Sequence, residues 1–231
     1  MRIWDISPGY LNRQSLLGEH RELHGIASIL VNGKKGYSRH PETLRWVGCD
    51  QALAQRHRQL ACEMALRGYR EQSPVLIQLG SGTIWPTVYI DQPEQQFVLL
   101  KVKYAERESG RIPLPRNAQQ LWSQHKYSVL ARDVQLYKDI GRAIAGGRAD
   151  FVRIAQQLTE LLRVPPSAGG VKNALQHIWG HVADLAPAPE ENPETWSLRK
   201  LLEETQHRAL LHKEPYLTAS TALSELMMWC E

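Results

Sequence analysis

The chain has 231 residues and a mass of 26.3 kDa, which suits one large or two small domains. With 42% hydrophobic and 23% charged residues, the composition is that of a folded globular protein and excludes disorder throughout the chain. The net charge is +4, and the whole excess lies in residues 1–72, where 11 Lys and Arg residues stand against 7 Asp and Glu residues. Such a basic segment is typical of proteins that bind polyanions, although domains that bind nothing acidic also carry it.

Three features bear on the compartment. No apolar run approaches the roughly 20 residues that a membrane-spanning helix needs, and the opening MRIWDISPGY lacks the pattern of a signal peptide. Cys49, Cys62 and Cys230 are odd in number, far apart and in no CxxC motif, so they encode neither a disulfide framework nor a zinc site. We expect a cytoplasmic protein with reduced thiols and no membrane partner; the oligomeric state stays open.

Three helices are expected in the first third of the chain, over about residues 12–31, 41–48 and 51–68. Asn12, Pro41 and Asp50 favour their N-termini, and Asn32-Gly33 favours the end of the first. Residues 83–90 and 96–104 are rich in β-branched and aromatic residues, and the DQPEQ segment between them is typical of a turn. This pattern predicts a β-hairpin over about residues 83–104.

The segment ESGRIPLPRN, residues 108–117, combines glycine, prolines and charge and indicates a boundary. Helical patterns follow over residues 118–131, 133–145, 149–163, 168–186, 194–213 and 216–229. The sequence therefore predicts a mainly α protein. A compact helical bundle with a small β-hairpin insertion occupies residues 1–110, and an all-α helical domain occupies residues 117–231.

The most informative motif is EHRELHG, residues 19–25, in the first expected helix. On a helical wheel, Gly18 and Gly25 fall within about 60° of Glu22, where larger side chains would cover its carboxylate. Each glycine inside a helix costs about 1 kcal/mol relative to alanine. Either a substrate approaches Glu22 closely, or another helix or strand packs against the glycines and leaves Glu22 solvated at the edge.

Four short motifs occur together in the first 70 residues: M-R-I at the start, R-E-L at 21–23, N-G-K at 32–34 and L-R-G-Y at 66–69. In order and spacing they resemble the pyrimidine-dimer DNA glycosylases of the phage endonuclease V type and their bacterial relatives. The resemblance implies a compact helical bundle that flips nucleotides out of damaged duplex DNA. The α-amino group of the first residue attacks the sugar C1′, and the strand is cleaved by β-elimination through a Schiff base.

On this sequence the resemblance makes the α-amine of Met1 the nucleophile and Glu22 the essential glutamate, with Arg2 and Arg21 as phosphate or substrate contacts. An α-amino group loses its proton about two to three pH units below a lysine side chain, so a larger fraction can attack at neutral pH. Arg2 favours retention of Met1, because an initiator methionine is normally removed only before small residues. Ser15 and Gly25 stand where the phage enzyme has a histidine and an arginine.

The loop NGKKGYSRHP follows the first helix and adds Lys34, Lys35, Tyr37 and Arg39 as candidate substrate contacts. Three cations and one aromatic ring can clamp phosphates and stack on a base; an ordinary solvated basic loop is the alternative. We expect no metal or organic cofactor.

Residues 117–225 resemble an uncharacterised helical domain known as a fusion partner of thiouracil desulfidases. This implies at most a helper role in binding nucleic acid or positioning a substrate. Because the net charge of this half is about zero, we expect any binding to be local, through His125, Lys126, Arg132 and Lys138. His177 and His181 have the i, i+4 spacing of a metal-binding pair, but no HExxH motif surrounds them, and a packing role is favoured.

Through the resemblance of its first 70 residues, the sequence predicts a DNA repair glycosylase with AP-lyase activity that acts on pyrimidine dimers or related damaged bases. One alternative is an N-glycosylase or processing enzyme for a modified base, with RNA as a further target. The other is a noncatalytic nucleic-acid-binding module.

Overall fold

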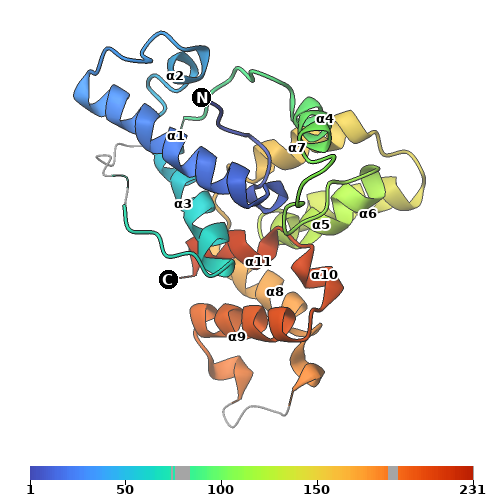
Figure 1. Cartoon of the computed structure of the whole chain (residues 1–231). Helices are drawn as coiled ribbons and strands as arrows, with labels where there is room; N and C mark the ends of the chain where they lie inside the picture. The colour runs from blue at the N-terminus through green and yellow to red at the C-terminus, as the bar shows by residue number, and fades with distance from the viewer. Residues whose placement is uncertain (74, 76–83, 187–191, 231) are drawn as a thin grey trace. The chain divides into compact units, whose positions relative to one another are not determined.

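The structure is a computed structural model, and it describes residues 1–73, 75, 84–186 and 192–230 (Figure 1). These residues fold into helices and connecting segments, and no strand forms among them. The chain divides into two compact units, Met1–Gly110 and Arg111–Glu231. The helical class expected from the sequence is confirmed.

The first unit is built around two helices that pack on each other, α1 (Arg13–Asn32) and α3 (Asp50–Leu66). Its other helices are η1 (Pro8–Tyr10), α2 (Pro41–Arg45) and α4 (Pro93–Lys103). The Asn12 side chain accepts the N–H of Ser15 at 2.9 Å and begins α1, and Gly33 ends it with a φ of +60°. The ends expected for this helix are confirmed. The residue before α3 is Cys49, so Asp50 is its first residue and not its cap.

Buried side chains of α1 and α3 form the core of the first unit. Leu16 and Leu23 of α1 and Leu53 and Leu60 of α3 have no solvent-exposed surface. A charged pair lies among them, since Arg56 of α3 donates through Nε to the Glu19 carboxylate at 2.7 Å. Each fully buried leucine stabilises the fold by about 1.5–3 kcal/mol relative to an exposed one.

The β-hairpin expected over residues 83–104 is wrong, because residues 93–103 form α4. Gln92 and Gln95 make a capping box, and Pro93 occupies the first turn, where its missing N–H costs no hydrogen bond. The DQPEQ segment is therefore a helix start and not a hairpin turn. Residues 84–92 are irregular, and position 83 lies outside the described residues.

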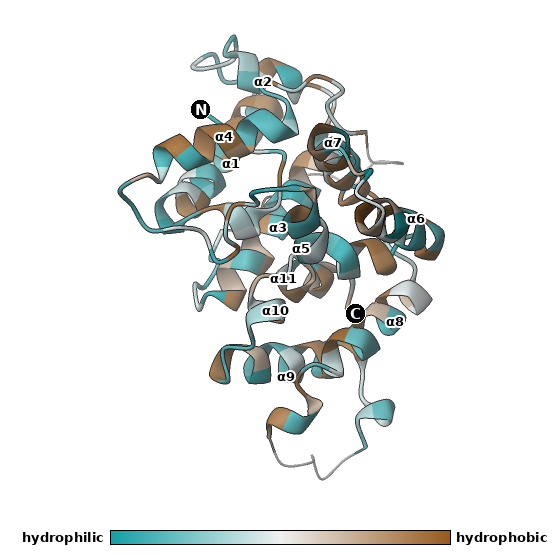
Figure 2. Cartoon of the chain, turned by 90° about the vertical axis from the view of Figure 1, so that its right-hand side faces the viewer, coloured by the Kyte–Doolittle hydropathy of each residue, from teal (hydrophilic) through white to brown (hydrophobic). Residues whose placement is uncertain are grey.

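The second unit is centred on α5 (Ala118–Leu130), which packs against α6 (Val134–Ala145), α7 (Phe151–Leu161), α8 (Ala168–Trp179) and α11 (Ala222–Glu225). The remaining elements are η2 (Ala183–Leu185), η3 (Pro193–Thr195), α9 (Leu198–Leu211), α10 (Pro215–Thr218) and η4 (Leu226–Trp229). The single helix expected over residues 216–229 is thus broken into three short ones. Hydrophobic and hydrophilic residues alternate along α9 in Figure 2, as in a helix that buries one face.

Polar contacts fix the packing of α5 within the second unit. Arg132, just beyond α5, donates to the Glu225 carboxylate at 2.9 and 3.0 Å, and the Ser128 hydroxyl lies 2.8 Å from that of Thr221. At the start of α8, a Cβ on Gly170 would lie 2.0 Å from the carbonyl oxygen of Ala131, so only glycine permits this approach.

None of the described helices is both long and apolar enough to cross a membrane.

Candidate active site and histidine cluster

The first residues of the chain are held in place by buried polar contacts. The side-chain oxygen of Gln96 in α4 accepts the N–H of Asp5 at 2.8 Å. Arg45 of α2 donates to the carbonyl oxygen of Ile3 at 3.3 Å and to the Asp5 carboxylate at 3.1 Å. The side chains of Ile3 and Ile6 are buried in the same segment. The start of the chain is therefore part of the folded unit.

This segment places the chain terminus beside Glu22 of α1. The backbone N–H of Arg2 donates to Oε2 of Glu22. The α-amine belongs to Met1, the residue that immediately precedes this N–H, so the amine and the carboxylate lie in one region of the surface. Both Met1 and Glu22 are partly exposed.

The two glycines near Glu22 face open space. A Cβ built on Gly18 or on Gly25 would meet no described atom within 4 Å. The interpretation that these glycines admit another helix or strand is therefore not supported at either position. The side of α1 that carries Glu22 is left uncovered where the glycines lie.

Arg2 is oriented by two neighbours. Its guanidinium forms an ion pair with Asp91 and lies 4.4 Å from the ring centre of Trp4. Its Nε and Nη2 are buried and have no hydrogen-bond partner among the described residues. These two nitrogens carry three N–H groups that no described residue satisfies. Arg21, the other arginine expected here, is exposed on α1.

The basic loop lies between α1 and α2. Lys34, Lys35, Tyr37 and Arg39 are all exposed, and 68% of the surface of Tyr37 is accessible. Arg45 of α2 bonds the segment that begins the chain, so one end of this loop is tied to the same region as Met1. Figure 1 shows α2 beside the marked N-terminus.

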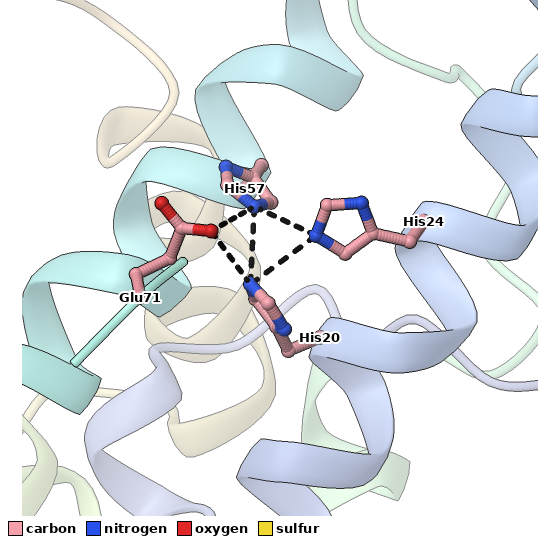
Figure 3. Close-up of side chains that lie close together, drawn as sticks. All are labelled: His20, His24, His57 and Glu71. Atoms are coloured by element: carbon pink, nitrogen blue, oxygen red, sulfur yellow. Dashed lines mark hydrogen bonds and ion pairs between the residues drawn. The ribbon is translucent and has the colours of Figure 1, made fainter. Parts of the chain in front are cut away.

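A second group of side chains lies between α1 and α3, and the sequence analysis did not identify it (Figure 3). It consists of His20 and His24 of α1, His57 of α3, and Glu71, which follows α3. The distance between Nε2 atoms is 3.1 Å from His20 to His57, 3.2 Å from His24 to His57 and 3.4 Å from His20 to His24. Oε1 of Glu71 lies 3.9 Å from Nε2 of His20 and 4.0 Å from Nε2 of His57.

The surroundings of two histidines of the cluster, His20 and His57, favour their neutral form. Burial, and then the neighbouring imidazoles His20 and His24, lower the pKa of His57 to about 4. Burial and His24 also lower the pKa of His20 below its usual value. Neutral imidazoles are the form that binds metal ions.

One signal for this cluster was present in the sequence. The EHRELHG motif carries His20 and His24 at the i, i+4 spacing that places two side chains on one helix face. His57 and Glu71 join them only through the packing of α1 on α3, which no spacing reveals.

In the histidine pair of the second unit, His181 has a packing role, as expected, whereas His177 is exposed. His181 Nε2 lies 2.5 Å from the Tyr127 hydroxyl, and its ring stacks on Tyr216 at 5.6 Å. Two of the contacts expected in this unit are wrong as surface contacts, because His125 is buried and the Arg132 side chain is buried in its ion pair with Glu225.

Comparison with known families gives two matches. Residues 1–76 match the family described as pyrimidine dimer DNA glycosylase, and residues 126–225 match a family described as a protein of unknown function, DUF1722. The two-part resemblance inferred from the sequence is thereby confirmed. The first match suggests pyrimidine dimer DNA glycosylase activity and a DNA substrate. Searches of curated proteins and of solved structures found no significant match.

Proposed function

We propose that this protein is a DNA repair glycosylase and AP lyase that acts on pyrimidine dimers or related damaged bases in duplex DNA. The α-amine of Met1 is the nucleophile, and Glu22 is its acid/base partner. The observation that carries the proposal is the hydrogen bond from the backbone N–H of Arg2 to the Glu22 carboxylate, which holds the terminal residue beside the one acid that the chemistry needs. The family match over residues 1–76 supports the same reaction.

The reaction divides into two covalent stages. In the first, the amine nitrogen of Met1 attacks C1′ of the flipped nucleotide and loses a proton. The glycosidic C1′–N bond breaks, and its electron pair leaves with the base, which takes up a proton. The sugar ring then opens when the C1′–O4′ bond breaks and O4′ is protonated, leaving a cationic imine between C1′ and the amine.

In the second stage, the imine withdraws electrons from C2′, so a C2′ proton can be removed. The electron pair forms a double bond between C2′ and C3′, and the 3′ phosphate leaves with the electrons of the C3′–O bond. Water finally hydrolyses the imine and restores the amine. Glu22 supplies or accepts the proton for ring opening, and its negative charge stabilises the cationic imine.

The open side of α1 gives the substrate room to approach. No described atom lies near a Cβ on Gly18 or Gly25, so a sugar-phosphate backbone can pass close to Glu22. Arg2 follows Met1 and has two guanidinium nitrogens, Nε and Nη2, without a partner among the described residues, and Arg21 is exposed on the same helix as Glu22. Phosphate contacts of this kind position a duplex without reading its sequence.

The exposed loop supplies further contacts in this proposal. Lys34, Lys35 and Arg39 bind backbone phosphates, and Tyr37 stacks on an unpaired base. The exposure of all four side chains supports these roles.

The direct test uses ultraviolet-irradiated plasmid for strand nicking, and borohydride to trap the imine on a dimer-containing oligonucleotide. We expect the full-length protein to form a reduced covalent adduct with damaged DNA and not with undamaged DNA. The Glu22→Gln variant is expected to lose roughly 10²–10⁴-fold in rate, the range for a lost general acid or base. Glu106→Gln, at an exposed position of the same unit, is the matched control and is expected to keep the full rate.

A second test addresses the nucleophile. Two residues added before Met1 convert its amine into an amide, which cannot form an imine. Measurement of the intact mass of the native and extended proteins defines each N-terminus. We expect the extended protein to bind damaged DNA without forming an adduct. Nicking that survives the extension unchanged would exclude the terminal amine from the mechanism.

The same assays separate the alternatives. An adduct formed only with a modified-base oligonucleotide or with RNA would replace the dimer as the substrate. Salt-sensitive binding with no adduct on any substrate would indicate a noncatalytic module.

A further inference from the structure

We propose that His20, His24, His57 and Glu71 form a binding site for one divalent transition-metal ion, zinc above all, that fixes α1 to α3 and to the segment that follows α3. The four ligand atoms come from three parts of the first unit and all lie within 4.8 Å of one another. The proposal is independent of the proposed function, because it concerns a different set of residues and a different property of the protein.

The spacing of the nitrogens fits tetrahedral coordination. Zn–N bonds of about 2.0–2.1 Å at the tetrahedral angle place two ligand nitrogens about 3.3–3.4 Å apart. The three Nε2–Nε2 distances are 3.1, 3.2 and 3.4 Å. Oε1 of Glu71 is farther away, at 3.9 Å from His20, 4.0 Å from His57 and within 4.8 Å of the ligand atom of His24, so this carboxylate has to move toward the three histidines to complete the tetrahedron.

Hydrogen bonding alone does not explain the arrangement. Each Nε2 atom either carries a proton or presents a lone pair. Among three such atoms in mutual contact, at least two are of the same kind, so at least one contact sets proton against proton or lone pair against lone pair. A cation at the centre of the triangle removes this conflict, because it accepts the lone pairs of all three nitrogens at once.

The donor set selects the ion. Three imidazole nitrogens and one carboxylate oxygen suit zinc, and they are poor ligands for the hard ions calcium and magnesium, which take oxygen. Four protein ligands fill a tetrahedral shell, so the site has the closed form of structural zinc sites.

The position of the cluster on α1 defines its role. Glu22 lies two residues from both His20 and His24, which at about 100° per residue places it roughly 160° around the helix from each. One side of α1 therefore carries the candidate catalytic carboxylate, and the other carries two metal ligands. A metal ion here acts on the orientation of α1 and not on the reacting atoms.

The test begins with the full-length protein without a histidine tag. Metal content is measured by elemental mass spectrometry on the protein as isolated. It is measured again after chelator treatment and reconstitution with Zn²⁺. We expect one bound zinc per chain, a lower Tm after metal removal and recovery of the Tm on reconstitution, since a ligand that binds only the folded state stabilises it. Replacement by Co²⁺ reports the geometry, and we expect the intense visible absorption of four-coordinate cobalt.

Variants connect the binding to these residues. His24→Ala is expected to lose stoichiometric binding. If His24→Ala does not fold, Glu71→Gln takes its place in the test, because it removes the one anionic ligand of the cluster. Loss of partners outside the ligand shell already weakens metal affinity about 10–100-fold, so loss of a ligand is expected to weaken it at least tenfold. His207→Ala, at an exposed position of α9, is the matched control and is expected to bind zinc normally.

Three results would overturn the proposal. The first is a wild-type protein that binds less than one zinc per chain under saturating Zn²⁺. The second is a cobalt spectrum of the weak six-coordinate type. The third is zinc affinity in Glu71→Gln and His24→Ala equal to that of His207→Ala.

Discussion

At the residue scale, the first unit contains an ion pair that is almost completely buried. Glu19 accepts from Arg56 at both oxygens, at 2.7 and 3.2 Å, and the two side chains are 0% and 2% exposed. Arg56 also donates to the carbonyl oxygen of Ile6 at 2.9 Å. This one guanidinium therefore connects α1, α3 and the segment that carries Met1.

Glu19→Ala leaves this guanidinium buried without its counter-charge. We expect the free energy of unfolding to fall by about 3–5 kcal/mol, the usual result of removing one partner of a buried pair. Urea unfolding followed by circular dichroism measures it. The double variant Glu19→Leu/Arg56→Met removes both charges and is expected to recover much of the loss. If the unfolding free energy of Glu19→Ala lay within about 1 kcal/mol of that of the wild type, the Glu19–Arg56 ion pair would contribute little to stability.

His125 gives the second unit a pH-dependent stability. Burial lowers its pKa to about 4, although the hydrogen bond to the carbonyl oxygen of Leu121 at 3.0 Å acts in the opposite direction. The unfolded chain takes up a proton near pH 6.5 and the folded chain only near pH 4. The contribution of neutral His125 is therefore complete above pH 6.5 and is lost as the pH falls from 6.5 to 4.

The expected loss across this window is about 3 kcal/mol. Unfolding free energies at pH 7, 5.5 and 4.5, compared between the wild type and His125→Phe, isolate the contribution of this residue from that of the other histidines. The unfolding free energy of the wild type minus that of His125→Phe is expected to decrease as the pH falls, because only the wild type loses the contribution of neutral His125. A difference that stays constant over the window would contradict the prediction.

The sequence could identify the residues of the candidate active site because a motif carries them. R-E-L marks Glu22, and the position of M-R-I marks Met1 and Arg2. The histidine cluster is marked only in part: EHRELHG carries His20 and His24, but His57 and Glu71 are 33 and 47 positions beyond His24 and join the cluster only in the folded unit. Long-range packing of this kind is not encoded in local spacing.

At the element scale, α4 shows where local propensity misleads. Its second half, with Val98, Leu99 and Val102, is rich in residues that favour strands, yet these three side chains are exposed and make no sheet. The buried residues Gln96, Phe97 and Leu100 lie on one helical face, at the i, i+1 and i+4 positions. The start signal at Gln92 and Pro93 determines the element, whereas the apolar content does not.

The Val98→Pro variant distinguishes the helix α4 from the strand that the sequence predicted at this position. Val98 is 62% exposed, so its side chain contributes little, and the variant mainly removes a backbone N–H inside the helix. We expect a loss of about 3 kcal/mol in the free energy of unfolding. Val98→Ala keeps the helix, has the better helix propensity and is expected to be neutral or slightly stabilising. Thermal unfolding of the two variants checks this, and equal stabilities would contradict a helix at residues 93–103.

At the scale of the whole molecule, the charge excess of the first unit is divided between structure and surface. Arg45, Arg56 and Arg67 are each paired with a carboxylate, and Arg2 is paired with Asp91. The exposed basic side chains of residues 1–72 are Arg13, Arg21, Lys34, Lys35, Arg39, Arg58 and Arg70. These exposed cations are accessible to a polyanion, in addition to the contact proposed for Arg2.

The salt dependence of DNA binding reports how many cations of the protein contact phosphates. The logarithm of the binding constant falls with the logarithm of salt concentration by about 0.9 per neutralised phosphate. The triple variant Lys34→Ala/Lys35→Ala/Arg39→Ala is expected to reduce the slope by about 2–3. Arg148→Ala/Arg153→Ala/Lys172→Ala removes three exposed cations of the second unit and is expected to leave the slope unchanged. If both triple variants reduced the slope equally, the exposed loop would not be a specific DNA contact, and cations of both units would contribute alike to DNA binding.

The helix α1 carries His20, Glu22 and His24 within five consecutive positions. One inserted residue would turn everything beyond it by about 100°, whereas a substitution would leave the register intact. An insertion between His20 and Glu22 would misalign either the carboxylate with the chain terminus or the imidazole pair with His57, and no rotation of the helix could correct both. We therefore expect length variation in homologous proteins to be absent from this stretch, whereas the exposed loop beyond Gly33 can accept it.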